Sequence, residues 1–437
     1  MKCFIPRGSI SIFCGFMAFL AWSCWSSTVL AEDGGAPQIN AGDTGWVLIS
    51  SALVLAMIIP GLALFYGGMV RSKNVLSTMM HSFIAICIVS VVWVFWGYSL
   101  AFAPDVGGVI GGLQWLGLSG VGPDPLEGFT IPHLAFMVFQ LMFAGITVAL
   151  ISGAIAERMK FSAFFLFAIL WVTFIYAPLA HWVWGGGWLA GLGDLDFAGG
   201  TVVHISSGVA ALACALVLGK RHGYGTDNMS PHNLPFTVVG ASLLWVGWFG
   251  FNAGSALAAN GVAASAFVAT HVATAAGALA WLGVEWGYRG KPTLLGAASG
   301  AVAGLVAITP AAGYVGPVSA IVIGLGGGVV CYLGVFLKNK LGYDDALDVL
   351  GIHGIGGTWG ALATGLFASM GGGMGLFFGN PGQVVIQAIG VGATWVFSFL
   401  GTFLILKIVD GVVGLRVNKE EEVLGLDLTQ HRERAYG

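Results

Sequence analysis

The sequence predicts an all-α membrane protein with eleven membrane-spanning helices. Three observations carry this prediction: the chain is very apolar, its apolar stretches are long enough to cross a bilayer, and its basic residues follow alternate stretches. Apolar residues make up 57% and charged residues 8% of the 437 residues, whereas soluble domains carry about 25% charged residues. A soluble protein of this length could not hide so much apolar surface, so most of it must face lipid or other spanning helices.

The first residues have the pattern of a secretory signal peptide. Lys2 and Arg7 precede an apolar run over residues 10–25, and small residues around Ala31 follow it. This order favours cleavage after Ala31 over an additional span. We therefore expect three parts: a cleaved signal peptide at 1–31, a membrane domain at 32–410 and a cytoplasmic regulatory tail at 411–437.

Eleven apolar stretches of the mature chain are long enough to span a bilayer. Short connectors rich in Gly, Pro, Asn and Asp separate them, as expected of turns. The predicted spans are 45–69, 78–102, 132–156, 161–181, 201–219, 235–256, 264–286, 293–311, 315–336, 347–369 and 384–408.

The basic residues predict the orientation of these spans. Each lies in a connector that follows an odd-numbered span or at the C-terminal end of the chain, and the positive-inside rule then puts the N-terminus outside and the C-terminus inside. These residues are Arg71, Lys73, Arg158, Lys160, Lys220, Arg221, Arg289, Lys291, Lys338, Lys340, Lys407, Arg416, Lys419, Arg432 and Arg434.

One short pattern occurs twice and predicts an internal symmetry. Residues 196–208 read DFAGGTVVHISSG and residues 345–357 read DALDVLGIHGIGG, so an aspartate precedes a histidine by eight residues and a glycine follows the histidine by four. At ~1.5 Å rise per residue, the histidine lies ~12 Å from the aspartate, near the midplane of a ~30 Å hydrocarbon core. Because five spans separate the two motifs, the sequence predicts two inverted five-helix repeats plus an eleventh helix.

The two motif histidines, His204 and His353, are therefore expected to meet at the midplane and line a polar path. An ionisable residue at this depth is costly and is by default a functional hypothesis. The alternative is that each is a satisfied core histidine. His271 also falls mid-span but has no counterpart in the other half, so we interpret it as a packing or subunit-interface residue.

Several longer motifs resemble the ammonium transporter family, which includes bacterial ammonium channels, yeast methylammonium permeases and Rhesus proteins. The resemblance covers nearly the whole mature chain and is closer to the bacterial channels. The motifs are FYGGMVRSKN at 65–74, AERMKFSA at 156–163, HWVWGGG at 181–187, DFAGGTVVHI at 196–205, GWFGFNAGS at 247–255, GIHGIGG at 351–357 and GLRVNKEEEVLGLD at 414–427.

The resemblance implies roles for individual residues. Phe143, Trp184 and Ser255 match an external recruitment site for ammonium, where aromatic faces hold a cation. Phe143 and Phe251 match two stacked rings that close the pore below that site, and the two motif histidines match the pore lining. Three further positions match residues of the pore region: Asp196, which also has the pattern of a helix N-cap, Tyr176 and Trp248.

The resemblance also implies a mechanism. Ammonium and potassium have similar ionic size, so a rigid ring of oxygens separates them poorly, but only ammonium can give up a proton. An apolar constriction rejects a cation through its desolvation cost and admits neutral ammonia, while two imidazoles can relay the proton. We expect an ammonium transporter with proton relay and electrogenic uptake; the alternatives are a passive channel for neutral ammonia gas and a non-transporting ammonium sensor.

Partners and location follow from the same resemblance. It implies a homotrimer with one pore per subunit in the bacterial cytoplasmic (inner) membrane, with a PII-type signalling protein at the cytoplasmic face and no nucleic acid. Arg432 departs from the family, which commonly has glycine there, and glycine permits backbone angles that arginine does not. No cofactor, metal or enzymatic activity is expected, because two imidazoles are too few for a catalytic zinc site.

Overall fold

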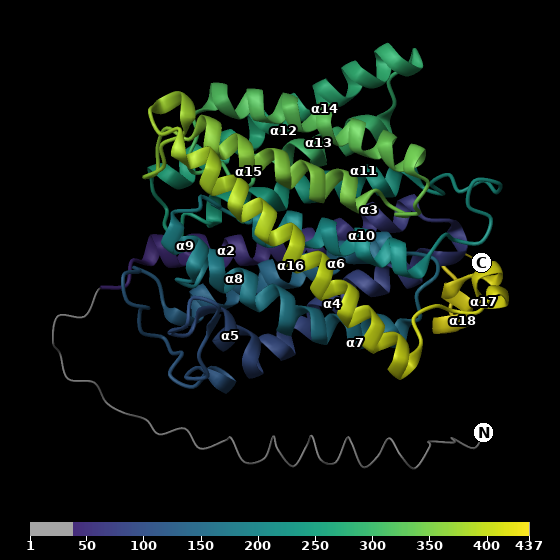
Figure 1. Cartoon of the computed structure of the whole chain (residues 1–437), viewed down its shortest axis with the longest axis horizontal. Coiled ribbons are helices and arrows are strands. Elements are labelled where there is room, and N and C mark those ends of the chain that lie inside the picture. Colours follow the sequence, from purple (N-terminus) through teal and green to yellow (C-terminus); the bar gives the residue numbers. More distant parts are fainter. Residues whose placement is uncertain (1–37, 437) are drawn as a thin grey trace. The chain divides into compact units, whose positions relative to one another are not determined.

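The structure, a computed structural model, describes residues 38–436, and within this range the chain is almost entirely helical (Figure 1). The predicted signal peptide at 1–31 lies outside the described residues. Nine helical segments in the described range are long and apolar enough to cross a membrane, which confirms the all-α membrane part of the prediction. They are Ala41–Met69, Ser72–Phe102, His133–Ile155, Phe161–Leu192, Gly200–Leu218, Leu234–Ala253, Gly261–Arg289, Pro317–Leu341 and Gly382–Val413.

The other two predicted spans also fall on helical residues. Leu294–Ile308 is a shorter apolar helix of 15 residues. Residues 350–367 form a helix that is not among the nine. The count of eleven spans therefore stays a prediction.

Several spans change helix type partway, which the sequence did not predict. Short π-helical segments interrupt the α-helices, and both motif histidines lie in such segments. In chain order the elements are α2 (Ala41–Ala56), η1 (Met57–Leu62), α3 (Ala63–Met69), η2 (Ser72–Asn74), α4 (Val75–Val92), η3 (Trp93–Gly97), α5 (Tyr98–Phe102), β1 (Asp105–Val106), β2 (Ile110–Gly111), η4 (Leu116–Leu118), α6 (His133–Ile155), α7 (Phe161–Trp171), η5 (Val172–Tyr176), α8 (Ala177–Trp184), α9 (Trp188–Leu192), η6 (Gly200–Ile205), α10 (Ser206–Leu218), α11 (Leu234–Trp248), η7 (Phe249–Ala253), α12 (Gly261–Arg289), α13 (Leu294–Ile308), α14 (Pro317–Leu341), η8 (Leu350–Gly354), α15 (Ile355–Phe367), η9 (Leu376–Phe378), α16 (Gly382–Val413), α17 (Lys419–Leu424) and α18 (Leu426–His431). Strands β1 and β2 pair antiparallel in the connector between α5 and α6.

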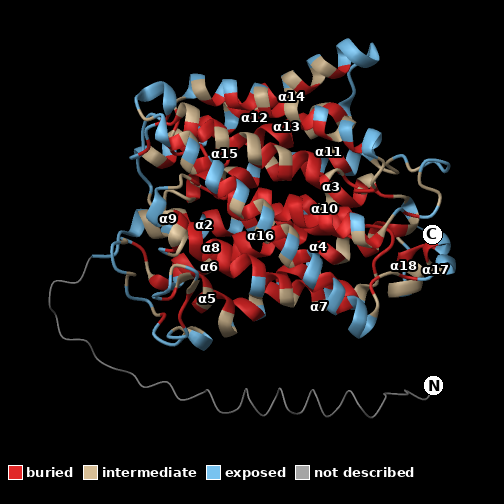
Figure 2. Ribbon diagram, viewed as in Figure 1, coloured by how far each residue is buried: buried red, intermediate tan, exposed pale blue. Residues whose placement is uncertain are grey.

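The most deeply buried helices are those that carry the candidate site. Within its most apolar window, α6 is 89% buried and the η6–α10 segment 83%, whereas α16 is only 28% buried. Figure 2 shows the same contrast, with buried residues concentrated on the inner helices and exposed residues along α16. Helix α16 therefore lies at the periphery of the bundle, and α6 and α10 lie at its centre.

The η6–α10 and η8–α15 segments cross at contacts made by glycines from both motifs, with α10 against η8 and α15 against η6. A side chain at Gly208 would collide with the backbone of Gly354, and one at Gly357 would lie 3.0 Å from the Cβ atom of His204 and 2.9 Å from a backbone carbonyl. These positions tolerate nothing larger than glycine without separating the helices. The glycine four residues after each histidine is thus explained by helix packing.

The C-terminal segment packs against the ends of α4 and α10 through specific hydrogen bonds. The guanidinium of Arg416 donates to Glu422 at 2.8 Å and to the carbonyl of Leu218 at 2.8 Å. The Asp427 carboxylate accepts the Ser77 backbone N–H at 2.8 Å. These contacts tie α17 and α18 to α4 and to the end of α10.

We expect Gly208→Ala to destabilise the protein, because the added methyl group must push η8 away from α10. Overpacking of this kind costs about 1–3 kcal/mol, which thermal unfolding of the detergent-solubilised protein would measure as a lowered midpoint. Gly392→Ala is the matched control, because Gly392 lies within α16 and a Cβ atom there meets nothing within 4 Å. An equal midpoint for both variants would contradict the packing role of Gly208.

Candidate functional site

The two motif histidines lie side by side in the centre of the bundle, as the repeat predicted. His204 is on η6 and His353 is on η8, and their Nδ1 atoms lie 3.2 Å apart. The rings are nearly parallel, with centroids 5.3 Å apart and an angle of 22° between their planes. His204 is 0% and His353 is 4% exposed, so the pair is sheltered from solvent.

This geometry makes the pair share one proton between facing nitrogens. A hydrogen bond between two Nδ1 atoms requires one to donate and the other to accept, and a neutral imidazole carries a single N–H. The histidine that accepts at Nδ1 therefore carries its own proton on Nε2. Within the described part of the chain, the Nε2 atom of His204 has no hydrogen-bond partner.

Aromatic rings extend this arrangement on one side of His204. Phe143 and Phe251 stack with centroids 4.2 Å apart and an interplanar angle of 29°. Phe251 in turn lies 6.0 Å from the ring of His204, and Trp248 flanks the same imidazole at 5.4 Å. The chain thus brings two predicted gate rings, the flanking tryptophan and the histidine pair into one continuous stack.

Cavities lie on both sides of this stack. One cavity, called the outer cavity, has a volume of about 280 Å³ and is lined by Phe143 among others. A second, called the inner cavity, has a volume of about 770 Å³ and is lined by Phe65, Glu285 and Asp348 among others. Between them, a space of about 10 Å³ is lined by both histidines, which is roughly the volume of one water-sized molecule. Phe65 and Val302 line both this space and the inner cavity, so the path narrows to one small molecule beside the histidines.

The outer cavity holds the three residues predicted to recruit a cation. Phe143, Trp184 and Ser255 all line it. The Trp184 indole meets the Phe143 ring edge to face at 5.8 Å and donates its N–H to the Asp196 carbonyl at 2.8 Å. The Ser255 hydroxyl donates to the Phe251 carbonyl at 2.8 Å, so its oxygen presents lone pairs rather than a proton to the cavity.

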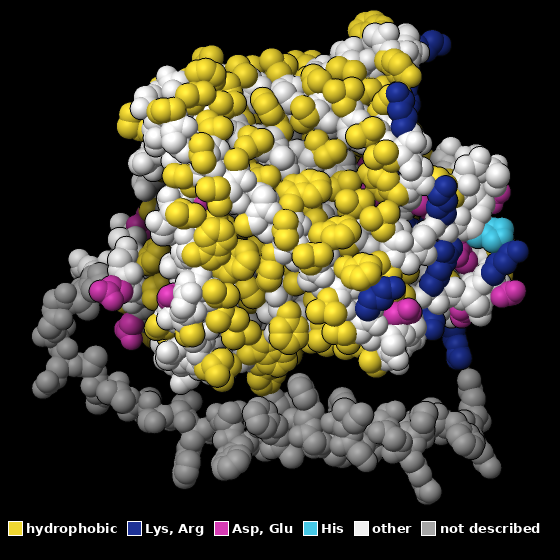
Figure 3. Space-filling model, viewed as in Figure 1, with side chains coloured by type: hydrophobic (Ala, Val, Ile, Leu, Met, Phe, Trp, Pro, Cys, Tyr) yellow, Lys and Arg dark blue, Asp and Glu magenta, His cyan; other side chains and the backbone are white. Residues whose placement is uncertain are grey.

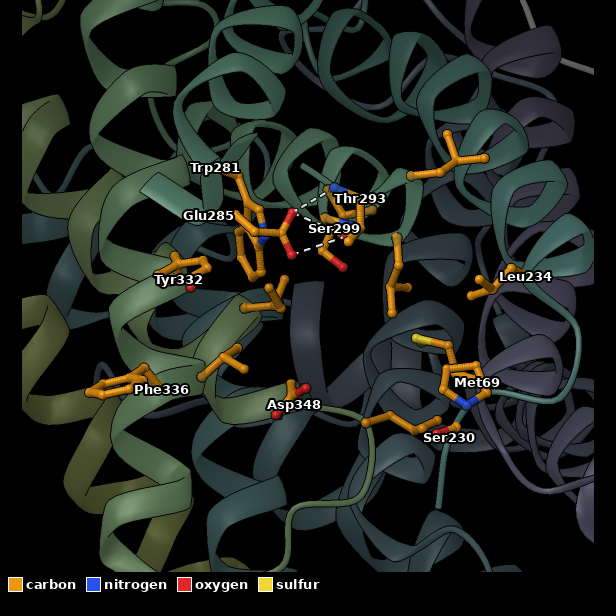
Figure 4. A pocket seen from close by; sticks show the side chains of 18 of the residues that line it. Met69, Ser230, Leu234, Trp281, Glu285, Thr293, Ser299, Tyr332, Phe336 and Asp348 are labelled. Atoms are coloured by element: carbon orange, nitrogen blue, oxygen red, sulfur yellow. Dashed lines mark hydrogen bonds between the residues drawn. The ribbon is translucent and has the colours of Figure 1, made fainter. Parts of the chain in front are cut away.

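The inner cavity differs because it has charged side chains, shown in Figure 4. Glu285 accepts hydrogen bonds from the backbone and hydroxyl of Thr293 at 3.0–3.1 Å. Asp348 forms an ion pair with Lys338. Both carboxylates are therefore engaged by groups of the chain itself.

The two motif aspartates hold the starts of the histidine-bearing helices, with different numbers of partners. The Asp196 carboxylate accepts the backbone N–H groups of residues 199–202 at 2.6–3.2 Å and the Thr201 hydroxyl at 2.5 Å. Asp345 accepts the Leu350 N–H through one oxygen at 2.8 Å, and its other oxygen has no partner in the described chain. Burial raises the pKa of Asp345 to about 6, although the charge of Lys338 opposes this.

Two predicted residues lie away from the stack. Tyr176 on η5 is fully buried and contacts Trp93 at 6.0 Å; its hydroxyl has no partner within residues 38–436. His271 on α12 is exposed and packs 5.4 Å from Trp245. No group of three or more His, Cys, Asp or Glu side chains in that same range is arranged to hold a metal ion.

Sequence reasoning missed several residues that line the path. Phe65 is part of the FYGGMVRSKN motif, but nothing in that motif indicates that the ring faces the histidines. Val302 and Gln140 lie in ordinary apolar helices and carry no local signal. The three-dimensional packing alone places them beside the site.

Known proteins match this chain over most of its length. A model of the Ammonium Transporter Family matches residues 45–436. An ammonium transporter of Bacillus subtilis (strain 168) is 60% identical over 404 residues, which cover 91% of this chain and 99% of that protein. The crystal structure of Mep2 from Candida albicans has a TM-score of 0.84 and 39% identity over 91% of both chains. A structure described as a sensor Amt protein has a TM-score of 0.83 and 31% identity, covering 89% of this chain and 98% of that one.

We expect opposite effects from neutralising the two motif aspartates. Asp196→Asn keeps one accepting oxygen but turns an NH₂ group toward backbone donors. The buried N–H groups left without an acceptor each lower the free energy of unfolding by about 1–3 kcal/mol. Its unfolding midpoint should fall at every pH. Asp345→Asn should equal or exceed the wild type at pH 7.5, because a carboxyl with a raised pKa is costly to ionise above about pH 6.

The pH dependence separates this explanation from a general effect of substitution. As pH falls through about 6, wild-type Asp345 takes up a proton in the folded state, so the wild type should gain stability relative to Asp345→Asn. Glu127→Ala, which removes an exposed carboxylate, serves as the control with no pH-dependent difference. A constant gap between the wild type and Asp345→Asn from pH 5 to 8 would rule the explanation out.

Proposed function

The chain belongs to the ammonium transporter family, and on that premise we propose how it carries its substrate. Ammonium is recruited in the outer cavity by Phe143, Trp184 and Ser255, gives up a proton near the Phe143–Phe251 gate, and crosses as ammonia beside His204 and His353. The histidine pair relays the proton, so uptake is electrogenic. The protein is a transporter or channel and not an enzyme.

The observation that carries this proposal is the stack of rings between two cavities. The ring centroids of Phe143 and Phe251 lie 4.2 Å apart. This stacking leaves no passage for a hydrated cation unless one of the rings moves. Beyond them, the only polar side chains lining the space of about 10 Å³ are the two histidines and the flanking Trp248. Trp248 donates its N–H to Thr309 at 2.9 Å, so the imidazole nitrogens are the groups available to a molecule in transit.

This arrangement separates ammonium from potassium by chemistry instead of size. A potassium ion would have to lose its hydration shell in an apolar space, which is costly. Ammonium avoids that cost by leaving its proton behind and crossing as a neutral molecule. The unpartnered Nε2 atom of His204 and the facing Nδ1 atoms provide donor and acceptor positions along which a proton can pass.

We further propose that the chain crosses the membrane eleven times as two inverted five-helix repeats plus α16, with the N-terminus outside and the C-terminus inside. Figure 3 supports this orientation: Lys and Arg side chains gather at the end of the described bundle that carries α17 and α18, and the visible face of the opposite end shows acidic ones. The boundaries 1–31, 32–410 and 411–437 belong to the same proposal.

We propose a homotrimer in the bacterial cytoplasmic (inner) membrane, surrounded by the lipid bilayer. The identity with a transporter of a bacterium supports the location. The exposed position of His271 on α12 supports its role in packing or at a subunit interface. A PII-type signalling protein is the proposed partner at the cytoplasmic face, where the tail is docked.

Two other functions remain as candidates. A passive channel for neutral ammonia would use the same apolar path without returning the proton. A non-transporting ammonium sensor is favoured by the 31% identity with a sensor Amt protein. A sensor would retain the recruitment site but carry no current, so a transport measurement distinguishes all three.

We expect an ammonium concentration jump on proteoliposomes to produce a transient current that a potassium jump does not. His204→Ala should abolish this current or replace it with a potassium leak, because the proton relay is broken and the path becomes wider. Thr201→Val is unsuitable as a control because it disturbs the Asp196 cap, so Ser242→Ala, an exposed position on α11, serves instead. Internal alkalinisation without any current would identify a neutral gas channel, and binding without either signal would identify a sensor.

Arg432 provides a test of the tail. It adopts φ 59° and ψ 33° at the C-terminus of α18, a left-handed conformation that costs a non-glycine residue roughly 1–2 kcal/mol. Arg432→Gly should therefore strengthen tail docking and slow hydrogen exchange of the α17 and α18 amides several-fold. Arg434→Gly, whose φ is not positive, should speed exchange slightly or leave it unchanged; a similar slowing in both would contradict this account.

A further inference from the structure

Asp194 carries a carboxyl group that the proposed transport path does not use. It lies two residues before the motif aspartate Asp196, in the segment that joins α9 to η6. Both of its carboxyl oxygens are buried and have no hydrogen-bond partner within residues 38–436. Burying an ionised carboxylate without a partner is very costly. The groups around Asp194 therefore decide which protonation state the fold can hold.

Helix α16 holds the residues on either side of Asp194 through two glutamines. Gln387 accepts the Leu195 N–H at 2.8 Å and donates to the Leu195 carbonyl at 2.9 Å. Gln383, one turn earlier on the same face, donates to the Gly193 carbonyl at 2.9 Å. The segment 193–195 is thus fastened to α16 by its backbone, with the Asp194 side chain enclosed between them.

The carboxyl group of Asp194 packs on the backbone of α16 and has no cationic side chain beside it. A Cβ atom added at Gly390 would lie 3.0 Å from its Oδ1 atom and 3.1 Å from its Oδ2 atom. The titratable groups that interact with it are Asp196, on the same segment, and Tyr314, in the connector between α13 and α14. Helix α9 and residues 368–390, which surround the segment, carry no titratable side chain.

These surroundings hold Asp194 in its neutral form. Burial and the neighbouring Asp196 raise the pKa of Asp194 well above its ordinary value, because ionisation would add a second negative charge where no cation is near. A protonated carboxyl group rests against Gly390 at a much smaller cost, whereas an ionised one must draw water or a donor into the contact. Ionisation therefore loosens the packing of the segment on α16.

The same segment carries the cap at the start of η6. The Asp196 carboxylate accepts the backbone N–H groups of residues 199–202 at 2.6–3.2 Å. The Asp196 carbonyl accepts the indole N–H of Trp184, which lines the outer cavity, at 2.8 Å. A displacement of the segment is therefore passed both to Trp184 and to the π-helical turn that carries His204.

We propose that Asp194 is a positioning residue: its neutral carboxyl group lets α16 hold the Asp196 cap in place, and its ionisation at alkaline external pH loosens the cap and slows transport. The only chemical step is the release of one proton from the carboxyl group to water on the outer side. This inference rests on the proposed function and goes beyond it, because it makes the path respond to external pH through a residue outside the path.

The test is the pH dependence of the ammonium current in proteoliposomes for the wild type and Asp194→Asn. Asparagine has nearly the shape of the neutral acid but cannot ionise. The two currents should agree at external pH 6, and at pH 8.5 the wild-type current should be several-fold smaller than that of Asp194→Asn. Comparison at equal pH cancels the change in the ratio of ammonium to ammonia. Asp124→Asn, which alters an exposed aspartate of the external connector, is the control and should follow the wild type.

Two measurements on the purified protein do not depend on transport. The infrared band of one protonated carboxyl group should disappear as the pH of the wild type rises, and this change should be missing in Asp194→Asn. Hydrogen exchange of the amides of residues 199–202 should be equal in the two proteins at pH 6. At pH 8.5 it should be several-fold faster in the wild type.

These measurements separate failure of this proposal from failure of the proposed function. If the infrared and exchange differences appear in a wild type that carries no current, transport is wrong and the coupling of Asp194 to the Asp196 cap is supported. A constant ratio of the wild-type and Asp194→Asn currents from pH 5 to 9, or no infrared difference between them, overturns the proposal. A current difference that vanishes when choline replaces sodium and potassium also overturns it, because that result identifies a metal-ion site.

Discussion

The close crossing of the η6–α10 segment with the η8–α15 segment is the constraint on which the rest of the site depends. Gly208 meets the backbone at Gly354, and Gly357 meets the first carbon of the His204 side chain. Because each glycine follows its histidine by one helical turn, the contact fixes the height and direction of both imidazoles together. The 3.2 Å separation of their Nδ1 atoms is therefore a consequence of backbone packing, which holds the pair more rigidly than the histidine side chains could alone.

The two motif aspartates also hold the starts of the histidine-bearing segments, but they accept different numbers of hydrogen bonds. Asp196 satisfies five donors at the start of η6, whereas Asp345 has one strong partner at the start of η8 and one unpartnered oxygen. The outer half-helix is accordingly the more firmly anchored one. The η8 segment begins beside Lys338, which donates to the Asp345 carbonyl and pairs with Asp348.

The sequence was sufficient for the features that repeat along the chain and insufficient for those that depend on packing. Apolar length predicted the fold class, and the spacing of Asp196, His204 and their counterparts predicted that two histidines would meet. The π-helical turns that carry both histidines were not predicted from the sequence. Asp194 was overlooked because a single aspartate in a connector carries no signal until the packing of α16 against it is known.

If the chain carries ammonium as proposed, selection takes place in two physically different steps, and neither would be sufficient alone. On that proposal, the outer cavity acts while the substrate is still a cation, through its aromatic rings and its uncharged lining. The histidine segment then discriminates by whether the substrate can lose a proton, since only a neutral molecule crosses an apolar space of about 10 Å³ cheaply. The first step selects by binding affinity and the second by the ability to lose a proton. The two selectivity factors are independent, so the overall selectivity is their product. Potassium can imitate the size of ammonium in the first step, but it has no proton to give up in the second.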